Sequence, residues 1–216
     1  MKNELGSEEI FKEVIDSEEE LRSMYGYPSE LVNNKSITLI DHHCRDYISK
    51  SPLLFIATSD SSGNCDVSPR GDAPGFVYVL DDKHLVIPER PGNRRFDSLR
   101  NILLNSKVGL IFIIPGLEET LRINGQARII KDQEIMVHME AQGKLPKLGI
   151  AVEVEECYMH CAKAFKRSHL WDDTYWPLKE ELPKPSVIIA DHAKKLGLSQ
   201  DDVSKSLKDS YENRLY

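Results

Sequence analysis

Apolar residues gather in the middle of the chain, in short runs whose length and composition favour β-strands. Residues 53–60 (LLFIATSD) form one such run, and the turn-forming sequence DSSGN ends it. Runs of the same kind lie at 76–88, 107–116, 119–132 and 148–160. Short runs rich in β-branched and aromatic residues, bounded by turn formers, are typical of strands. About six or seven strands broken by a few helices predict a mainly β protein, a β-barrel with peripheral helices.

The two ends of the chain carry helical patterns instead. Ser17 followed three residues later by Glu20 predicts a capped helix start, and Ser199 followed by Asp202 predicts another. A proline-rich linker separates the barrel pattern from the last helices. We therefore expect three parts, namely a helical lead-in at 1–50, a barrel at 51–172 and a helical C-terminal extension at 173–216.

The segment IPERPGNRRFDSLRN, residues 87–101, carries an unusual charge pattern between two predicted strands. It predicts a helix over 93–104 with Asn93 as its N-cap, which places Arg94 and Arg95 in the first helical turn. Cations there are disfavoured by about 0.3–1 kcal/mol, because the exposed N–H groups already carry partial positive charge. A phosphate bound by those N–H groups and the two guanidinium groups would reverse that penalty.

The same helix pattern also indicates how the segment packs. Phe96, Leu99 and Leu103 recur at helical spacing and predict one apolar stripe, while Ser98 shares another face with Arg95. The alternative interpretation treats both arginines as solvated surface residues, paired with Asp97 or Glu89. The spacing matches neither a Walker A motif nor a dinucleotide-binding glycine motif.

Charge and composition narrow the functional classes. The chain has 28 Lys and Arg against 35 Asp and Glu, a net charge of −7, which makes non-specific binding to nucleic acid or anionic membranes a poor fit. No run of about 18 apolar residues predicts a membrane span. The first residues are acidic and lack the apolar core of a secretory leader. The four cysteines show no disulfide spacing, so we expect a cytoplasmic protein with reduced thiols.

Four segments, in this order and spacing, resemble the pyridoxamine 5′-phosphate oxidase-like superfamily of FMN-binding split barrels. They are SPRGDAPGFV (68–77), LVIPERPGNRRFDSLRNILLNSKVGLIF (85–112), IPGLEETLRINGQARI (114–129) and HCAKAFKRSHLW (160–171). The resemblance covers roughly residues 40–172 and is closest to a bacterial branch whose substrate is unassigned. It implies an FMN-binding split β-barrel and a homodimer with two cofactor sites at the subunit interface.

The resemblance also assigns roles to individual positions. Arg94 and Arg95 would hold the FMN phosphate, with Asn93 and Ser98 beside them. The positions expected along the flavin ring system and ribityl chain are Ser68, Pro69, Arg70, Gly71, Ile87 and Pro88. The positions expected to reach a flavin across the dimer interface are Thr120, Arg122, Arg167 and Trp171. A pyridoxamine-phosphate oxidase ends in an Arg-Leu-His-type segment, whereas this chain has RSHLWDD and a further helical tail, so that substrate is not implied.

Two sequence motifs offer metal-binding residue types. Residues 157–161 contain Cys157, His160 and Cys161, and residues 42–44 read His-His-Cys. Structural zinc takes four ligands, commonly two matched Cys or His pairs, and nothing in the sequence places these two motifs near each other. Small buried cysteines are the favoured interpretation, and no metal is expected.

Other residue types near the expected site have ordinary structural interpretations. Asp66, Asp72 and Glu89 could act as acids or bases but are more often structural or solvent-facing. The aromatic group of Trp171, Tyr175 and Trp176 is more often core or interface, with a flavin contact considered for Trp171 alone. Flavin chemistry takes place on the isoalloxazine ring and requires mainly positioning from the protein. No catalytic residue is therefore singled out.

We expect an FMN-dependent oxidoreductase that transfers hydride or electrons to or from a small molecule not identified by the sequence. One alternative is a non-catalytic flavin-binding carrier or sensor, with the tail docking a partner. Another is a split barrel that holds haem, for which His160 or His169 would be the axial candidate.

Overall fold

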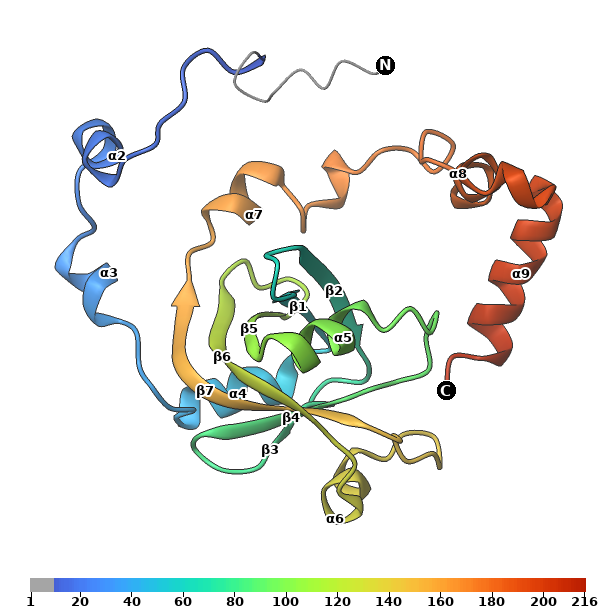
Figure 1. The fold of residues 1–216 in the computed structure, drawn as a ribbon, viewed down its shortest axis with the longest axis horizontal. Helices are drawn as coiled ribbons and strands as arrows, with labels where there is room; N and C mark the ends of the chain where they lie inside the picture. The colour runs from blue at the N-terminus through green and yellow to red at the C-terminus, as the bar shows by residue number, and fades with distance from the viewer. Residues whose placement is uncertain (1–9) are drawn as a thin grey trace. The chain divides into compact units, whose positions relative to one another are not determined.

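The computed structural model describes residues 10–216, and the chain divides into a unit that ends at Ser36 and a larger unit from Ile37 to Tyr216 (Figure 1). The first unit holds two short helices, α2 (Glu18–Tyr25) and α3 (Glu30–Asn34). The side chain of Ser17 accepts the backbone N–H of Glu20, which confirms the predicted helix start. No helix in the described part of the chain is both long and apolar enough to span a bilayer.

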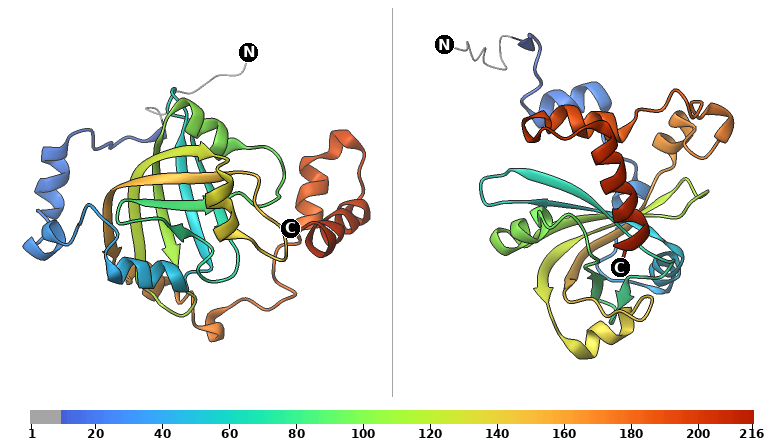
Figure 2. Two further views of the ribbon diagram at one scale, coloured as in Figure 1. Left: turned by 90° about the horizontal axis from the view of Figure 1, so that it is seen from below. Right: turned by 90° about the vertical axis from the view of Figure 1, so that its right-hand side faces the viewer.

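The larger unit is built on one antiparallel sheet of seven strands in the order β2-β1-β5-β6-β7-β4-β3. The strands are β1 (Leu53–Ser59), β2 (Cys65–Gly71), β3 (Tyr78–Val79), β4 (His84–Pro88), β5 (Lys107–Ile113), β6 (Thr120–Ile130) and β7 (Gly149–His160). Figure 2 shows the sheet from two further sides, twisted and curled around its core. Strands β2 and β3 are the two edges and do not pair with each other, so the barrel is split, as expected.

The sheet bends at a β-bulge between Asn124 and Gly125, where the long pair β6 and β7 shifts register. A Cβ atom on Gly125 would lie 2.1 Å from the carbonyl oxygen of Glu153. Only glycine allows the two backbones to approach this closely. The bulge therefore depends on the absence of a side chain at residue 125.

Alternating positions of the strands fill the inside of the barrel. The largest fully buried side chains include Leu54, Ile56, Leu85, Ile87, Phe112, Leu121, Ile123 and Ile150. Helix α4 (His42–Lys50) packs Cys44, Tyr47 and Ile48 onto this core. Tyr47 also donates its hydroxyl hydrogen bond to the carbonyl of Glu119 (2.8 Å). This apolar interior is the scaffold on which the polar edge around β2 is built.

Helix α5 (Asp97–Leu104) packs differently from the prediction. Leu99 and Ile102 are buried, whereas Phe96 is 49% exposed and Leu103 is 74% exposed. The predicted stripe of Phe96, Leu99 and Leu103 is therefore wrong. Because the helix begins at Asp97 rather than in the preceding loop, Phe96 precedes the helix and is not part of its packed face.

The remaining helices lie in the connection from β6 to β7 or follow β7 in the C-terminal part of the chain. They are α6 (Gln133–Met136), α7 (Lys163–Ser168), α8 (Pro185–His192) and α9 (Gln200–Asn213), with 3-10 turns η1 (Val137–Met139), η2 (Asp173–Tyr175) and η3 (Lys194–Leu196). Helix α9 starts with the predicted cap, since Ser199 and Asp202 each accept the other's backbone N–H. Helices α8 and α9 pack against each other.

Candidate functional site

A cavity of about 460 Å³ lies beside edge strand β2. Its walls are Asp66 and residues 68–71 on β2, Asp72 directly after it, residues 88–98 from the end of β4 to the start of α5, Phe76, and residues 215 and 216. Volumes of about 300–1,000 Å³ are usual for small-ligand sites. The cavity therefore has the size of a cofactor site.

Most of the predicted cofactor residues meet at this cavity. Those that line it are Ser68, Pro69, Arg70, Gly71, Pro88, Asn93, Arg94, Arg95 and Ser98. The predicted contact at Ile87 differs, because that side chain is fully buried in the core. Residues 68–71 and 93–98 come from separate parts of the chain, and the fold brings them to one place.

The loop that carries the two arginines is not helical. Arg94 and Phe96 both have left-handed backbone conformations, with φ of 62° and 60°. Helix α5 accordingly starts at Asp97, with Phe96 as an N-cap that makes no side-chain hydrogen bond. The carboxamide oxygen of Asn93 accepts the N–H of Arg95 (3.0 Å) and so closes a turn within the loop. The prediction that Asn93 caps the helix, with both arginines in its first turn, is therefore wrong.

The left-handed residues explain the difference. A non-glycine residue in this region costs about 1–3 kcal/mol, persists only where surrounding contacts impose it, and is found preferentially at ligand sites. Two such residues, Arg94 and Phe96, flank Arg95. The arginines thus project from a strained loop at the cavity wall, and the helix-dipole conflict inferred from the sequence does not arise.

The two arginines have different surroundings. Arg95 forms an ion pair with Asp97 (2.8 Å) and its side chain is 73% exposed. Arg94 has no ion-pair partner within the part of the chain that the structure describes. The alternative interpretation of surface pairing with Asp97 therefore holds for Arg95, while Glu89 pairs with Arg70. Arg94 keeps all its donors available for an anion.

Two ion pairs connect the end of β2 and the residue that follows it with the β4–α5 connection. Arg70 Nε lies 3.3 Å from Glu89 Oε2, and Arg90 Nε lies 2.6 Å from Asp72 Oδ2. Arg70 also donates to Ser68 Oγ at 2.5 Å. The Arg70–Glu89 contact is poorly aligned, so among the described residues neither of its two buried atoms has a hydrogen bond. Orphaned buried polar atoms at a cavity are what a ligand or an ordered water satisfies.

The cavity carboxylates are engaged by neighbouring donors. Asp66 accepts the hydroxyl of Ser98 (2.9 Å), and Glu89 is paired with Arg70. Burial raises the pKa of Asp72, but hydrogen bonds from Tyr216, from the next backbone N–H and from Arg90 outweigh it and hold that pKa below its usual range. Asp72 is therefore a stable anion near neutral pH rather than a base.

The cavity residues that were not predicted from the sequence include Arg90, Leu215 and Tyr216. Arg90 lies inside a motif that was recognised, and its position next to Glu89 was the available signal. Nothing local marks Leu215 or Tyr216, because they reach the cavity from a helical tail with no recognised motif. Their placement depends on contacts between residues more than a hundred positions apart.

The residues expected to act across a subunit interface lie outside the walls of this cavity. Thr120 begins β6 and is buried, and the Arg122 guanidinium lies 5.5 Å from the centre of the Tyr158 ring. Arg167 belongs to α7, and the Trp171 indole donates to the carbonyl of residue 117 (3.1 Å). Within one chain they do not join the site, and their contribution from a partner subunit stays a prediction.

The other two tail aromatics make local contacts. The Tyr175 ring stacks on His169 with ring centroids 4.0 Å apart. The Trp176 indole donates to the carbonyl of Leu170 at 3.0 Å. Both aromatic residues therefore hold the segment after α7 together.

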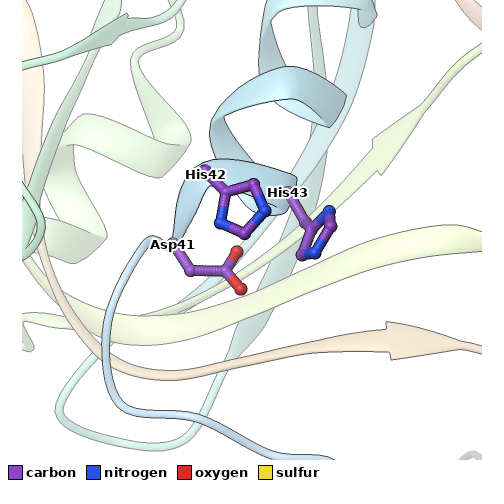
Figure 3. A group of neighbouring side chains, drawn as sticks. All are labelled: Asp41, His42 and His43. Atoms are coloured by element: carbon purple, nitrogen blue, oxygen red, sulfur yellow. The ribbon is translucent and has the colours of Figure 1, made fainter.

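The residues of the cysteine and histidine motifs form two separate groups, a cluster at the start of α4 and a buried pair of cysteines. Figure 3 shows Asp41, His42 and His43 together at the start of α4, with potential ligand atoms within 4.8 Å of one another. Asp41 already accepts the backbone N–H of Cys44 (2.8 Å) as the cap of that helix. Cys44 itself is buried, with its sulfur 3.3 Å from the sulfur of Cys157. The fold therefore brings together two motifs that nothing in the sequence placed near each other.

The buried Cys157 thiol is held in its protonated form. The hydrogen bond with Cys44 and burial both raise the pKa of the Cys157 thiol. A thiol that does not ionise is a poor nucleophile and a poor metal ligand. Cys65 and Cys161 are exposed. The favoured interpretation of buried structural cysteines thus holds for Cys44 and Cys157 and not for the other two.

Comparison with known proteins places this geometry in context. Residues 40–161 match the family model described as pyridoxamine 5′-phosphate oxidase. None of the curated proteins matches the chain. HupZ of Group A Streptococcus is 23% identical with a TM-score of 0.45, covering 56% of this chain and 93% of that one. HutZ, the heme storage protein of Vibrio cholerae, is 16% identical with a TM-score of 0.41, covering 56% and 93%. An FMN-binding protein of Syntrophomonas wolfei is 9% identical with a TM-score of 0.41, covering 54% and 88%.

Proposed function

The chain belongs to the pyridoxamine 5′-phosphate oxidase family, whose model matches residues 40–161 of its 216, and we propose that it binds FMN in the cavity beside β2. The observation that carries the proposal is the meeting of the Arg94–Arg95 loop with the polar strand segment 68–71 around one cavity. A flavin mononucleotide needs both a site for its phosphate and a surface for its ring.

The residues present fit the two ends of such a ligand. At one end, Arg94 has unpaired guanidinium donors, and Arg95 can exchange its exposed pair with Asp97 for a phosphate. At the other end, Arg70 has a buried Nε without a hydrogen bond among the described residues. Pro69, Phe76 and Pro88 supply apolar wall between the polar groups. This mixture of apolar wall and few polar anchors is characteristic of cofactor sites.

The proposed activity is oxidation or reduction of a small molecule. Bound FMN would supply the hydride or electron transfer, and the protein would supply binding and orientation. The paired states of Asp66, Asp72 and Glu89 favour a structural role for these carboxylates over proton transfer. The alternative is a non-catalytic flavin carrier or sensor, and reduction under anaerobic conditions by NADH or NADPH distinguishes the two.

Haem is the less favoured cofactor. No histidine lines the cavity in the described part of the chain, and the tail candidates His160 and His169 lie outside its walls. A haem site would require an axial ligand near the metal. The observed donors, arginine and backbone, suit a phosphate better than an iron atom.

A homodimer would complete the proposed site. Thr120, Arg122, Arg167 and Trp171 lie away from the cavity of their own chain, so they would reach a flavin only from a second copy. Light scattering on the purified protein tests this, and a monomer that binds FMN at full affinity would contradict it. A cytoplasmic location is part of the same proposal.

The direct test is the absorption spectrum of the purified protein, followed by mass spectrometry of the released cofactor. A flavin spectrum with released FMN supports the proposal. Apoprotein that gains no flavin on incubation with FMN, or a haem spectrum, would overturn it. Riboflavin, which lacks the phosphate, is the matched control ligand and should bind more weakly.

A further inference from the structure

The segment that follows α8 and α9 reaches the cavity beside β2, where Tyr216 forms part of its wall. The Tyr216 hydroxyl donates a hydrogen bond to Asp72 Oδ1 (2.5 Å), and the Arg90 guanidinium lies 5.9 Å from the centre of its ring. Lys144 donates to the Tyr216 backbone carbonyl at 2.8 Å. Three side chains from different parts of the barrel unit therefore hold one residue of the tail.

Asp72 is the anchor of this arrangement. Its side chain is 4% exposed and already bound by Arg90 Nε at 2.6 Å. A buried carboxylate needs several donors, and hydrogen bonds to an ionised acceptor are about twice as strong as neutral ones. Removing the Tyr216 hydroxyl would leave one lone-pair region of this carboxylate without its donor. The contact is thus part of the charge balance of the cavity wall.

Tyr216 forms a wall of the cavity and does not fill it. The volume of about 460 Å³ is the space that is open with Tyr216 and Leu215 in place. Tyr216 also joins Phe76 and Phe96 as an aromatic residue at this cavity. Aromatic side chains around a cavity suit a planar aromatic ligand, against which they pack by stacking or edge contact.

We propose that Tyr216 is a ligand-binding residue of this cavity, delivered by the α8–α9 extension, so that docking of the tail and binding of ligand are coupled. The ligand class is a planar aromatic ring that carries a phosphate, and in this respect the inference rests on the proposed function. Coupling is reciprocal, so ligand binding stabilises the docked tail as much as the docked tail favours binding.

The docking contact is tested first without any ligand. Hydrogen–deuterium exchange is measured on peptides covering α9 and residues up to 216, in the wild type and in the variants Tyr216→Phe and Asp72→Asn. Both variants should exchange faster there. Tyr211→Phe is the matched control, because Tyr211 is a tyrosine of α9 that is 65% exposed. Wild-type exchange in Tyr216→Phe and Asp72→Asn would overturn the docking contact.

The binding role is tested with FMN and riboflavin titrations of Tyr216→Ala and Tyr216→Phe. Tyr216→Ala should weaken both ligands by about tenfold, because it removes ring contact rather than phosphate contact. Tyr216→Phe keeps the aromatic ring and should therefore lose less affinity for both ligands. Unchanged or tighter FMN binding by Tyr216→Ala would overturn the inference while the proposed function stands. Absence of flavin binding by the wild type would instead overturn the proposed function, and with it the ligand role of Tyr216.

Discussion

Ser98 donates a hydrogen bond from its hydroxyl to the carboxylate of Asp66 (2.9 Å), and this contact ties the first turn of α5 to strand β2. Ser98 is only 2% exposed, so water cannot readily replace the bond. The resemblance placed Ser98 beside a phosphate, yet its one hydroxyl proton is already given to Asp66. The contact of Ser98 therefore holds the start of α5, and the Arg94–Arg95 loop before it, against the sheet.

Ser98→Ala should therefore destabilise the fold by about 1.5–3 kcal/mol, the usual size for a hydrogen bond to a charged group. Urea unfolding measures this change, and a double-mutant cycle with Asp66→Asn isolates the pairwise part. FMN affinity should fall less than in the Arg94 and Arg95 variants. A fall as large as theirs would show that Ser98 binds the phosphate directly.

Removing both loop arginines should abolish phosphate recognition. Arg95→Ala alone is expected to weaken FMN binding by about ten- to a hundredfold, because one charged hydrogen bond is worth about 1.5–3 kcal/mol, and adding Arg94→Ala should weaken it further. Riboflavin affinity should change little. Arg100→Ala, an exposed arginine on α5, is the matched control. Equal FMN affinity in the double variant and the wild type would disprove the phosphate assignment.

Docking of Tyr216 on Asp72 should depend on pH at both extremes. The pKa of Asp72 is lowered in the folded protein. Its contribution to the free energy of unfolding is therefore present above the ordinary carboxyl pKa of about 3.9 and is lost as the pH falls through the lower folded pKa. The hydrogen bond to Asp72 raises the pKa of Tyr216, so its contribution is present below about pH 10 and is lost as the pH rises through the raised value. The free energy of unfolding of the wild type minus that of Tyr216→Phe should be largest between these limits. A flat difference would contradict the contact.

The four cysteines should react in two classes. Cys65 and Cys161 are exposed and should react quickly with a thiol reagent, whereas Cys44 and Cys157 should react only on unfolding. Titration of the free thiols in native and in denatured protein counts the residues in each class. Fast labelling of all four thiols in the native protein would mean that α4 does not stay packed on β7.

The N-cap residue of α4, Asp41, should contribute more to stability than Asp46, a charged surface residue of the same helix. Asp41→Ala removes the acceptor of the Cys44 N–H and should cost about 0.5–2 kcal/mol of stability. Asp46→Ala on the same helix removes only an exposed pair with Lys50 and should cost about 0.5 kcal/mol or less. Denaturant unfolding compares the two. Equal effects would show that Asp41 does not cap the helix in solution.

Some features of this protein could be predicted from the sequence because they are local. Apolar runs and turn formers located the strands other than β2, and Ser17 and Ser199 were recognised as helix caps, since each cap bonds a backbone group three residues away. The recognised motifs also joined the segments at 68–71 and 93–98, which line one cavity. These features depend on neighbours in sequence or on a pattern of residues along it.

Tertiary contacts decided the rest. The left-handed Arg94 and Phe96 run against intrinsic preference, so the helix begins four residues later than the predicted start at Asn93. The pairs Cys44–Cys157 and Asp72–Tyr216 join residues more than a hundred positions apart. No local pattern encodes such pairs, because their energy comes from burial and from charges that meet only after the sheet has formed. The sequence thus determined most of the strands, the two helix caps and the presence of two adjacent arginines before α5, while the folded chain alone decided how their loop is bent and which residue of the C-terminal segment completes the cavity.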